Sequence, residues 1–262
     1  AALVGIRGDF HSGVEVAAEL LAIRGRVLPS TSDYVTLVGS TVSGETLIGE
    51  TRVGNSSDHL RSLTLIPVEP DAHPEAVRAI EDADMVVIGP GSLFTSIVPN
   101  LLISGIADAL SNSKAFKVYV CNVAEEPAQT EGYSVQDHLN IIQHYGGENA
   151  VDAVVANNNL PDGPTPAGLD FIRASRPWGD DDILLVGADV IDETDASSTA
   201  RHDPVKLSNA LTEAYRRYRG QRRRLPRVRL NLDLRRPGNG RIDLNVSSKT
   251  ETLSLSKKPN DP

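Results

Sequence analysis

The chain has 262 residues, of which 40% are hydrophobic and 23% charged, a balance typical of a globular protein. No stretch approaches the roughly 18 apolar residues that span a bilayer, and no secretory signal is visible, so we expect a cytoplasmic protein without a membrane span. Cys121 is the only cysteine, which excludes an internal disulfide and a cysteine-rich zinc site.

The charge is divided unevenly along the chain. Residues 1–215 carry 12 lysines and arginines against 31 aspartates and glutamates, whereas residues 216–262 carry 14 against 4. The acidic body argues against extended nucleic-acid binding by the fold, because the nucleic-acid backbone is itself negatively charged. Only the basic tail offers a surface for nucleic acid.

Hydrophobic periodicity predicts the elements of the first third. A helix is expected at residues 10–23, and alternating residues around the Ser43-Gly44 turn predict a β-hairpin over 34–53. A further strand follows at 62–68, and Pro74 begins a short helix within 73–84.

From residue 84 the chain alternates between strands and helices. Strands are expected within residues 84–91, 116–123, 150–159 and 182–191, and helices within 95–113, 134–146 and 203–220. Pro99 should bend or start the first of these helices. Ser134 should cap the second, with Gly146 just past its C-terminus. This alternation predicts an α/β fold of the Rossmann-like three-layer type, with a mainly parallel sheet covered on both faces.

The C-terminal extension differs in composition from the rest. Residues 227–246 alternate around a Pro-Gly-Asn-Gly turn and favour an added hairpin, whereas residues 247–262 have a disordered composition. We therefore divide the chain into a Rossmann-type domain at 1–219 and a basic tail at 220–262.

The ends of the predicted parallel strands carry the candidate ligand-binding residues, because ligands of such sheets bind there. Gly89 and Gly91 allow close approach of the backbone to a ligand, and Ser92, Thr95 and Ser96 add hydroxyls at a helix N-terminus. This pattern fits a phosphate cradle, but it also fits an ordinary strand-to-helix turn. It lacks the lysine of a P-loop.

Asparagines follow the next two strands. Asn122, Asn157 and Asn158 offer donors and acceptors for a base or ribose, although asparagine is also a common turn residue. Asp203 and Pro204 suit the start of the last helix. Arg201, just before them, is a candidate phosphate ligand or a plain surface residue.

Acidic side chains provide weaker candidates. Glu125, Glu126 and Glu131 could hold Mg²⁺ through a phosphate, so Mg²⁺ is a possible cofactor, while Asp180, Asp181 and Asp182 fit a solvated loop better than a metal site. We assign no metal ligand and no catalytic residue, because no Ser-His-Asp set can be chosen from spacing. Cys121 is expected to pack as a small apolar residue.

Four segments carry a resemblance to a known family. Residues 23–37, 88–110, 118–139 and 201–211 resemble the YvcK/CofD-like family, in the same order and over about residues 1–219. The motif "SLFTS" followed by "PNLL" after Gly-Pro-Gly is similar to the corresponding motif in the bacterial branch of gluconeogenesis factors. The other branch contains the 2-phospho-L-lactate transferases of deazaflavin-cofactor synthesis.

The resemblance implies a Rossmann-like domain that binds a uridine nucleotide-sugar and regulates cell shape and cell-wall precursor supply on gluconeogenic carbon sources. It implies that Gly89, Gly91, Ser92, Thr95 and Ser96 line the phosphate cleft, with Asn122, Asn157 and Asn158 at neighbouring strand ends and Arg201 on the nucleotide-sugar. A homodimer is a possible assembly.

Two departures from the family pattern matter. Residues 8–29 match a point beyond the Gly-Gly-Gly-Thr-Gly loop of family members, so we expect this chain to lack the first βα units. The basic tail is not part of the pattern.

The alternative hypotheses are a Mg²⁺-dependent phospho-lactyl transferase, which uses the same cleft, and a nucleic-acid or protein partner bound by the tail.

Overall fold

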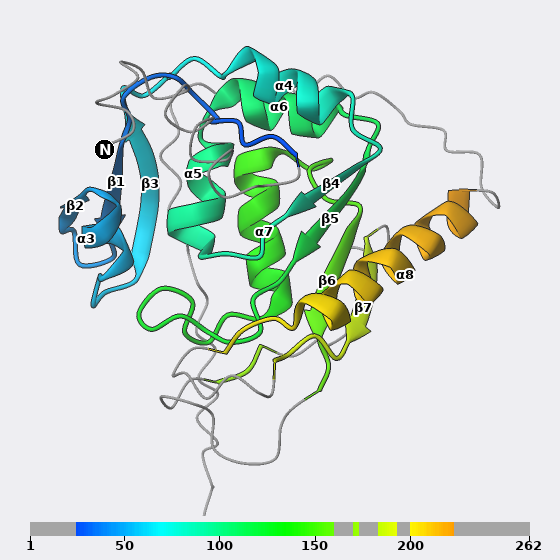
Figure 1. Ribbon diagram of the computed structural model, residues 1–262. Helices are drawn as coiled ribbons and strands as arrows, with labels where there is room; N and C mark the ends of the chain where they lie inside the picture. Colours follow the sequence, from blue (N-terminus) through cyan, green and yellow to red (C-terminus); the bar gives the residue numbers. More distant parts are fainter. Residues whose placement is uncertain (1–24, 160–169, 173–182, 193–199, 223–262) are drawn as a thin grey trace, which may run out of the picture.

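The computed structural model describes residues 25–159, 170–172, 183–192 and 200–222 (Figure 1). The helix expected at 10–23, the acidic run at 180–182 and the tail hairpin at 227–246 lie outside the described residues.

The first described unit is a small antiparallel sheet. It contains β1 (Thr36–Thr41), β2 (Thr46–Ile48) and β3 (Leu60–Ile66), in the order β2-β1-β3. Val38 pairs with Ile48 on one side and with Thr64 on the other. Because side chains alternate along a strand, Leu37 and Leu47 are buried while Ile48 is exposed. The predicted hairpin and third strand are confirmed.

The expectation that the hairpin extends to residue 53 is wrong. After Gly49, whose φ is +94°, the residues Glu50–Gly54 form the short helix α3. Val53 is fully buried and packs against Gly39 of β1, where a Cβ would lie only 3.2 Å from its Cγ2 atom. Burial of Val53 under the sheet therefore overrides the alternating pattern of this segment.

The second sheet is parallel and has the order β4-β5-β6-β7. Its strands are β4 (Met85–Ile88), β5 (Phe116–Val120), β6 (Ala153–Asn157) and β7 (Leu184–Ala188), each paired in parallel with the next. Tyr119 and Val154 join the core on one face, whereas Val118 and Val155 join the core on the other. This confirms the predicted three-layer fold.

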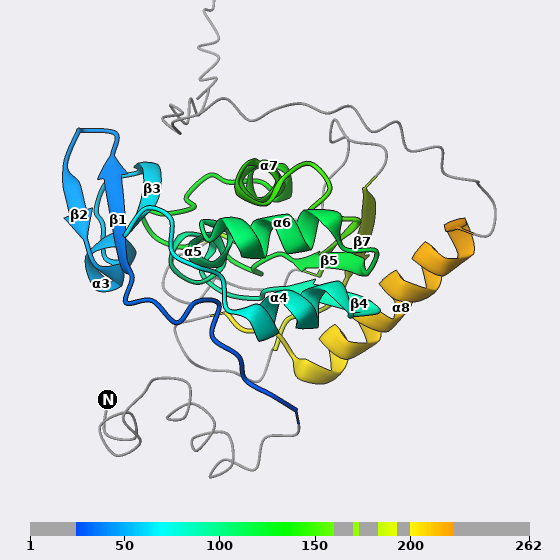
Figure 2. The same ribbon diagram turned by 90° about the horizontal axis from the view of Figure 1, so that it is seen from above.

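Helices cover both faces (Figures 1 and 2). One face packs against α4 (Pro74–Glu81), η1 (Leu93–Ile97), α5 (Val98–Leu101), α6 (Ser104–Asn112) and α7 (Val135–Gly146). The other face packs against α8 (Pro204–Arg222). Ser134 caps α7 through a reciprocal pair of hydrogen bonds with Asp137, as predicted for the cap.

Three helix boundaries differ from the prediction. The helix expected over 95–113 is divided by an 81° bend between Leu93–Leu101 and Ser104–Asn112. Pro99 lies in the first turn of α5, so of its two predicted roles it starts a helix and does not make the bend. The break follows from Ile103, which is extended and buried. Gly146 ends α7, with Gly147 as its C-cap, and α8 continues through Gly220 to Arg222.

Within the ranges that the structure describes, no single helix is both long and apolar enough to cross a membrane. There, only the two helical segments on either side of the 81° bend, taken together, have the length and composition of a membrane span.

Candidate functional site at the carboxyl edge of the parallel sheet

The carboxyl ends of the parallel strands meet along one edge of the sheet. Gly89, directly after β4, has a φ of +81°, and a Cβ there would lie 3.1 Å from the carbonyl oxygen of Val120 at the end of β5. Cys121 N donates to Val155 O at 2.9 Å, and Asn158 N donates to Ala188 O at 3.0 Å. These contacts join the four strand ends into one continuous rim.

The loop after β4 brings its glycines and hydroxyls close together. Ser92 precedes η1, and its carbonyl accepts the first helical hydrogen bonds, from Ser96 N and Ile97 N at 3.0 Å each. The backbone amides before Ser96 therefore have no acceptor within the helix, as in helix N-termini that bind anions. A Cβ on Gly91 would lie 3.3 Å from Ser96 Cβ, so the small residue keeps this turn compact.

The three predicted hydroxyl residues differ in surroundings. Ser92 Oγ lies 3.4 Å from Gln129 Oε1 and donates to it. Thr95 is half-buried against the end of α3, with its Cγ2 atom 3.6 Å from the position of a Cβ on Gly54. Ser96 is exposed, and its carbonyl accepts from Asn100 Nδ2 at 2.7 Å.

A turn at residues 126–130 forms the wall opposite this loop. Glu126 O accepts from Gln129 N and Thr130 N, and Glu126 N donates to Thr130 Oγ1 at 2.8 Å. Gln129 Nε2 donates to Gly54 O at 2.9 Å, so one buried side chain connects the loop to α3. Gln129 is not among the predicted site residues, because in this segment only the carboxylates suggested a ligand.

Buried polar groups without hydrogen-bond partners lie behind the loop. Tyr119 Oη, Glu126 Oε2 and His138 Nε2 are each shielded from solvent and have no partner among the described residues. The rings of Tyr119 and His138 stack, with centroids 6.5 Å apart. Buried polar atoms normally have partners, and exceptions call for an explanation. Strand alternation, which places Tyr119 on the face of Cys121, is a signal that could have found this cluster.

Burial determines the protonation of these groups. It raises the pKa of Cys121 to about 12, raises the pKa of Tyr119 well above its usual value, and lowers the pKa of His138. Burial also raises the pKa of Glu126, against the opposing effect of the Ser92 side chain and the Leu93 amide. Cys121 is fully buried as predicted, and it is a neutral thiol.

The three asparagines have different environments. Asn157 is buried, and its amide bonds to the backbone of Asn159 and accepts from Val190 N at 3.4 Å. These bonds give Asn157 a structural role that ties β6 to the end of β7. Asn158 is exposed beyond the strand, and Asn122 is half-buried after β5. Ligand contact by these asparagines stays a prediction.

The segment before α8 completes the rim. His202 Nε2 donates to Cys121 O at 3.1 Å, and Asp203 caps α8 by accepting from Val205 N and Lys206 N. Arg201 is exposed next to His202, and its carbonyl accepts from Asp192 N at 2.9 Å. Lys206 forms an ion pair with Asp189 at 2.9 Å. The structure thus brings Arg201 to the same edge as the glycine loop.

The acidic residues of the loop after β5 do not form a metal site in the part of the chain that the structure describes. No three histidine, cysteine or carboxylate side chains there gather closely enough to hold an ion. Glu126 faces Ser92, whereas Glu131 is exposed. That these acids hold Mg²⁺ through a bound phosphate stays a prediction.

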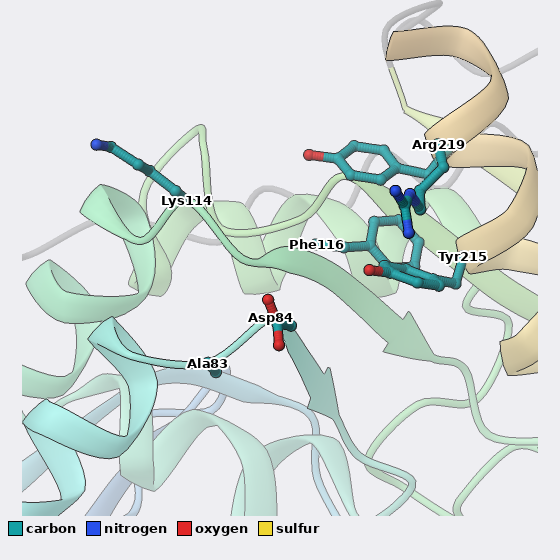
Figure 3. Close-up of a pocket in the computed structure, with 7 residues that line it drawn as sticks. Ala83, Asp84, Lys114, Phe116, Tyr215 and Arg219 are labelled. Carbon is teal, nitrogen blue, oxygen red and sulfur yellow. The ribbon is translucent and has the colours of Figure 1, made fainter. Parts of the chain in front are cut away.

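A separate hollow of about 410 Å³ lies at the opposite edge, where β4 and β5 begin (Figure 3). Phe116, Tyr215 and Tyr218 form its aromatic wall, with Asp84, Lys114 and Arg219 around it. It includes none of the predicted ligand residues. Since ligands of parallel sheets bind at the carboxyl edge, the glycine loop is the better candidate site.

Comparison with known proteins adds independent findings. A family model described as "2-phospho-L-lactate transferase CofD" matches residues 1–169. A "Putative gluconeogenesis factor" of Nostoc is 37% identical over 225 residues, which cover 82% of this chain and 48% of that protein. The "Gluconeogenesis factor" of Bacillus subtilis is 32% identical over 219 residues, covering 81% and 68%.

A solved structure shares the fold. The crystal structure of a UPF0052 family protein from Bacillus halodurans superimposes with a TM-score of 0.71 at 30% identity, covering 80% of this chain and 69% of that one. The chain spans about half the length of the Nostoc relative and about two thirds of the other two proteins.

Proposed function

The chain belongs to the YvcK/CofD-like family, in its gluconeogenesis-factor branch, and on that premise we propose that it binds a uridine nucleotide-sugar at the loop 89–96 and acts as a regulator. The observation that carries the proposal is the rim itself. The glycine loop, the asparagine strand ends and Arg201 come from separate parts of the sequence and meet at one edge.

Each part of the rim suits one part of such a ligand. The first-turn amides of η1 and the hydroxyls of Ser92 and Ser96 suit the diphosphate, because they are hydrogen-bond donors at the positive end of a helix dipole. Asn122 and Asn158 can pair with a base or ribose through donor and acceptor atoms. Arg201 can add a bidentate contact with a phosphate.

The regulatory role is the physiological part of the proposal. Relatives bear the name gluconeogenesis factor, and we propose that this chain adjusts cell shape and the supply of cell-wall precursors during growth on gluconeogenic carbon sources. A uridine nucleotide-sugar is a chemically suitable signal, because such compounds carry sugars into wall synthesis. A homodimer and a partner of the basic tail stay predictions.

Calorimetric titration with UDP-N-acetylglucosamine tests the binding proposal. We expect saturable heat and a rise in melting temperature. We expect Ser92→Ala to weaken binding by roughly ten- to hundredfold, since a hydrogen bond to a charged group contributes about 1.5–3 kcal/mol. Ser40→Ala in β1 is the control, because Ser40 lies in the other sheet. Absence of both heat and thermal shift would refute the proposal.

The transferase hypothesis makes a different prediction for the same site. A phospho-lactyl transferase would consume a nucleoside-diphosphate-linked substrate in the presence of Mg²⁺ and release a nucleotide. Product analysis after long incubation of the protein with such a substrate separates the two: intact ligand supports a binding regulator, and Mg²⁺-dependent turnover supports an enzyme.

A further inference from the structure

Glu126 is held against the loop that we propose as the phosphate site. Its backbone is anchored in both directions, since its amide donates to Thr130 Oγ1 at 2.8 Å and its carbonyl accepts from Gln129 N and Thr130 N. Its carboxyl group interacts with the Ser92 side chain and the Leu93 amide, which are the first donors that a bound phosphate would meet. The acid therefore faces the cradle instead of solvent.

The described residues around Glu126 offer little to neutralise it. Among the residues that the structure describes, its Oε2 atom is buried without a hydrogen-bond partner, and so is the hydroxyl of Tyr119 on β5, which lies within electrostatic reach of Glu126. His138 of α7, stacked on Tyr119, is buried and held in its neutral form. The loop 89–97 contains no lysine or arginine. A phosphate entering the loop would meet a negative charge without a cation from the loop itself.

In this arrangement the binding free energy of a phosphate becomes less favourable as its negative charge increases. A terminal phosphate monoester carries close to two negative charges near neutral pH, because its second pKa is about 6. Each phosphate of a diphosphate that is esterified at both ends carries only one. Repulsion from a nearby carboxylate grows in proportion to the charge of the phosphate.

We propose that Glu126 is a specificity-determining residue, which makes the loop accept the singly charged phosphates of a diphosphate diester ahead of a doubly charged terminal phosphate. This inference rests on the proposed function, because it concerns the same site. It explains why an acid faces a phosphate loop: the acid lets the protein discriminate a nucleotide-sugar from the nucleoside diphosphate that remains after the sugar has been transferred.

Protonation provides a second consequence. Burial raises the pKa of Glu126, and a terminal phosphate next to it would raise that pKa further. Binding of a nucleoside diphosphate should therefore take up a proton, whereas binding of a nucleotide-sugar should take up a smaller fraction of one. The groups around Glu126 do not supply this proton near neutral pH, because Tyr119 and Cys121 stay protonated.

The test compares UDP-N-acetylglucosamine with UDP on the wild-type chain, on Glu126→Gln and on Glu131→Gln. Glu131 is an exposed acid of the same loop, so its variant removes one charge without changing the cradle. Titration in buffers of different ionisation enthalpy gives both the dissociation constants and the number of protons taken up. Glutamine keeps the shape of the side chain and removes its charge.

We expect the wild-type chain to prefer the nucleotide-sugar, and Glu126→Gln to tighten UDP binding by about tenfold more than it tightens UDP-N-acetylglucosamine binding, which is about 1.4 kcal/mol. Proton uptake with UDP should disappear in Glu126→Gln and persist in Glu131→Gln. If both ligands bind but the variant changes their affinities equally, or if Glu131→Gln has the same effect, the inference is wrong while the proposed function stands. If neither ligand binds any of the three proteins, both fall together.

Discussion

The imidazole of His202 donates from Nε2 to the carbonyl oxygen of Cys121 at 3.1 Å, across 81 residues of sequence. The bond joins the end of β5, in the middle of the parallel sheet, to the turn that starts α8. It holds the Arg201 segment at the rim beside the strand ends. Burial lowers the pKa of His202, so the neutral ring is the form that makes this bond.

Replacement of His202 by alanine should destabilise the fold by about 1–3 kcal/mol, because the carbonyl of Cys121 would lose its partner in a buried place. Chemical denaturation measures the loss. His59→Ala is the matched control, since His59 is exposed, and it should change stability by less than about 0.5 kcal/mol. Equal effects of the two variants would show that the hydrogen bond has little energetic weight.

Stability should fall as the solution becomes acidic, and two histidines should account for part of the fall. Burial lowers the pKa values of His138 and His202 in the folded chain, while in the unfolded chain a histidine has a pKa near 6.5. The unfolded state therefore binds more protons, so their contribution is present above about pH 6.5 and is lost as the pH falls through that value.

Melting temperatures taken one unit above and one unit below about pH 6.5 test this pH dependence. The difference between them should shrink in His138→Gln, whereas His59→Gln should leave it unchanged. An undiminished difference in His138→Gln would indicate that other groups, such as carboxylates, cause the acid sensitivity.

A methyl group at Gly89 should disturb the loop more than one at Gly132. Both glycines have a positive φ, +81° and +74°, so alanine costs about 1–2 kcal/mol of backbone strain at either position. Only at Gly89 would the new Cβ also lie 3.1 Å from Val120 O and 3.3 Å from Ile97 Cδ1, while Gly132 has open space. Crowding should add about 1–3 kcal/mol, as for other overpacked sites.

Denaturation of Gly89→Ala and Gly132→Ala measures the difference directly, and ligand titration shows its effect on the site. We expect Gly89→Ala to lose nucleotide-sugar binding and Gly132→Ala to keep it. If the two variants were equally stable, close packing of the loop against β5 would not be a constraint.

Ala128→Gly should stabilise the protein. Ala128 has a φ of +57°, the only positive value among the described residues other than glycine. Relief of about 1–2 kcal/mol of strain exceeds the 0.5–1 kcal/mol entropic cost of a glycine, so a net gain of about 0.5–1 kcal/mol is expected. Ala83→Gly, which has no such strain, should lose stability instead. A loss in both variants would contradict the prediction.

The polar cluster behind the loop could be predicted only in part. The pattern of apolar strands, the glycines at 89 and 91 and the hydroxyls after them are local features, and they were sufficient to predict the sheet and its loop, while a ligand at the carboxyl edge stays a prediction. Strand alternation places Tyr119 on the face of Cys121, but the sequence does not show which groups Tyr119 and Gln129 contact. Their roles depend on contacts with Gly54, Ser92 and Glu126, which come from other elements.

The sequence by itself determined the α/β class, the positions of the parallel strands along the chain, the helix caps at Ser134 and Asp203, and the family. It could do so because periodicity, capping and sequence motifs are properties of neighbouring residues. The tertiary structure alone decided that residues 50–54 are helical, that the helix after Ser92 bends at Ile103, that Asn157 is used structurally, and that Glu126 faces the loop. These outcomes follow from burial against distant elements, and the free energy of such burial exceeds the local preferences of the chain.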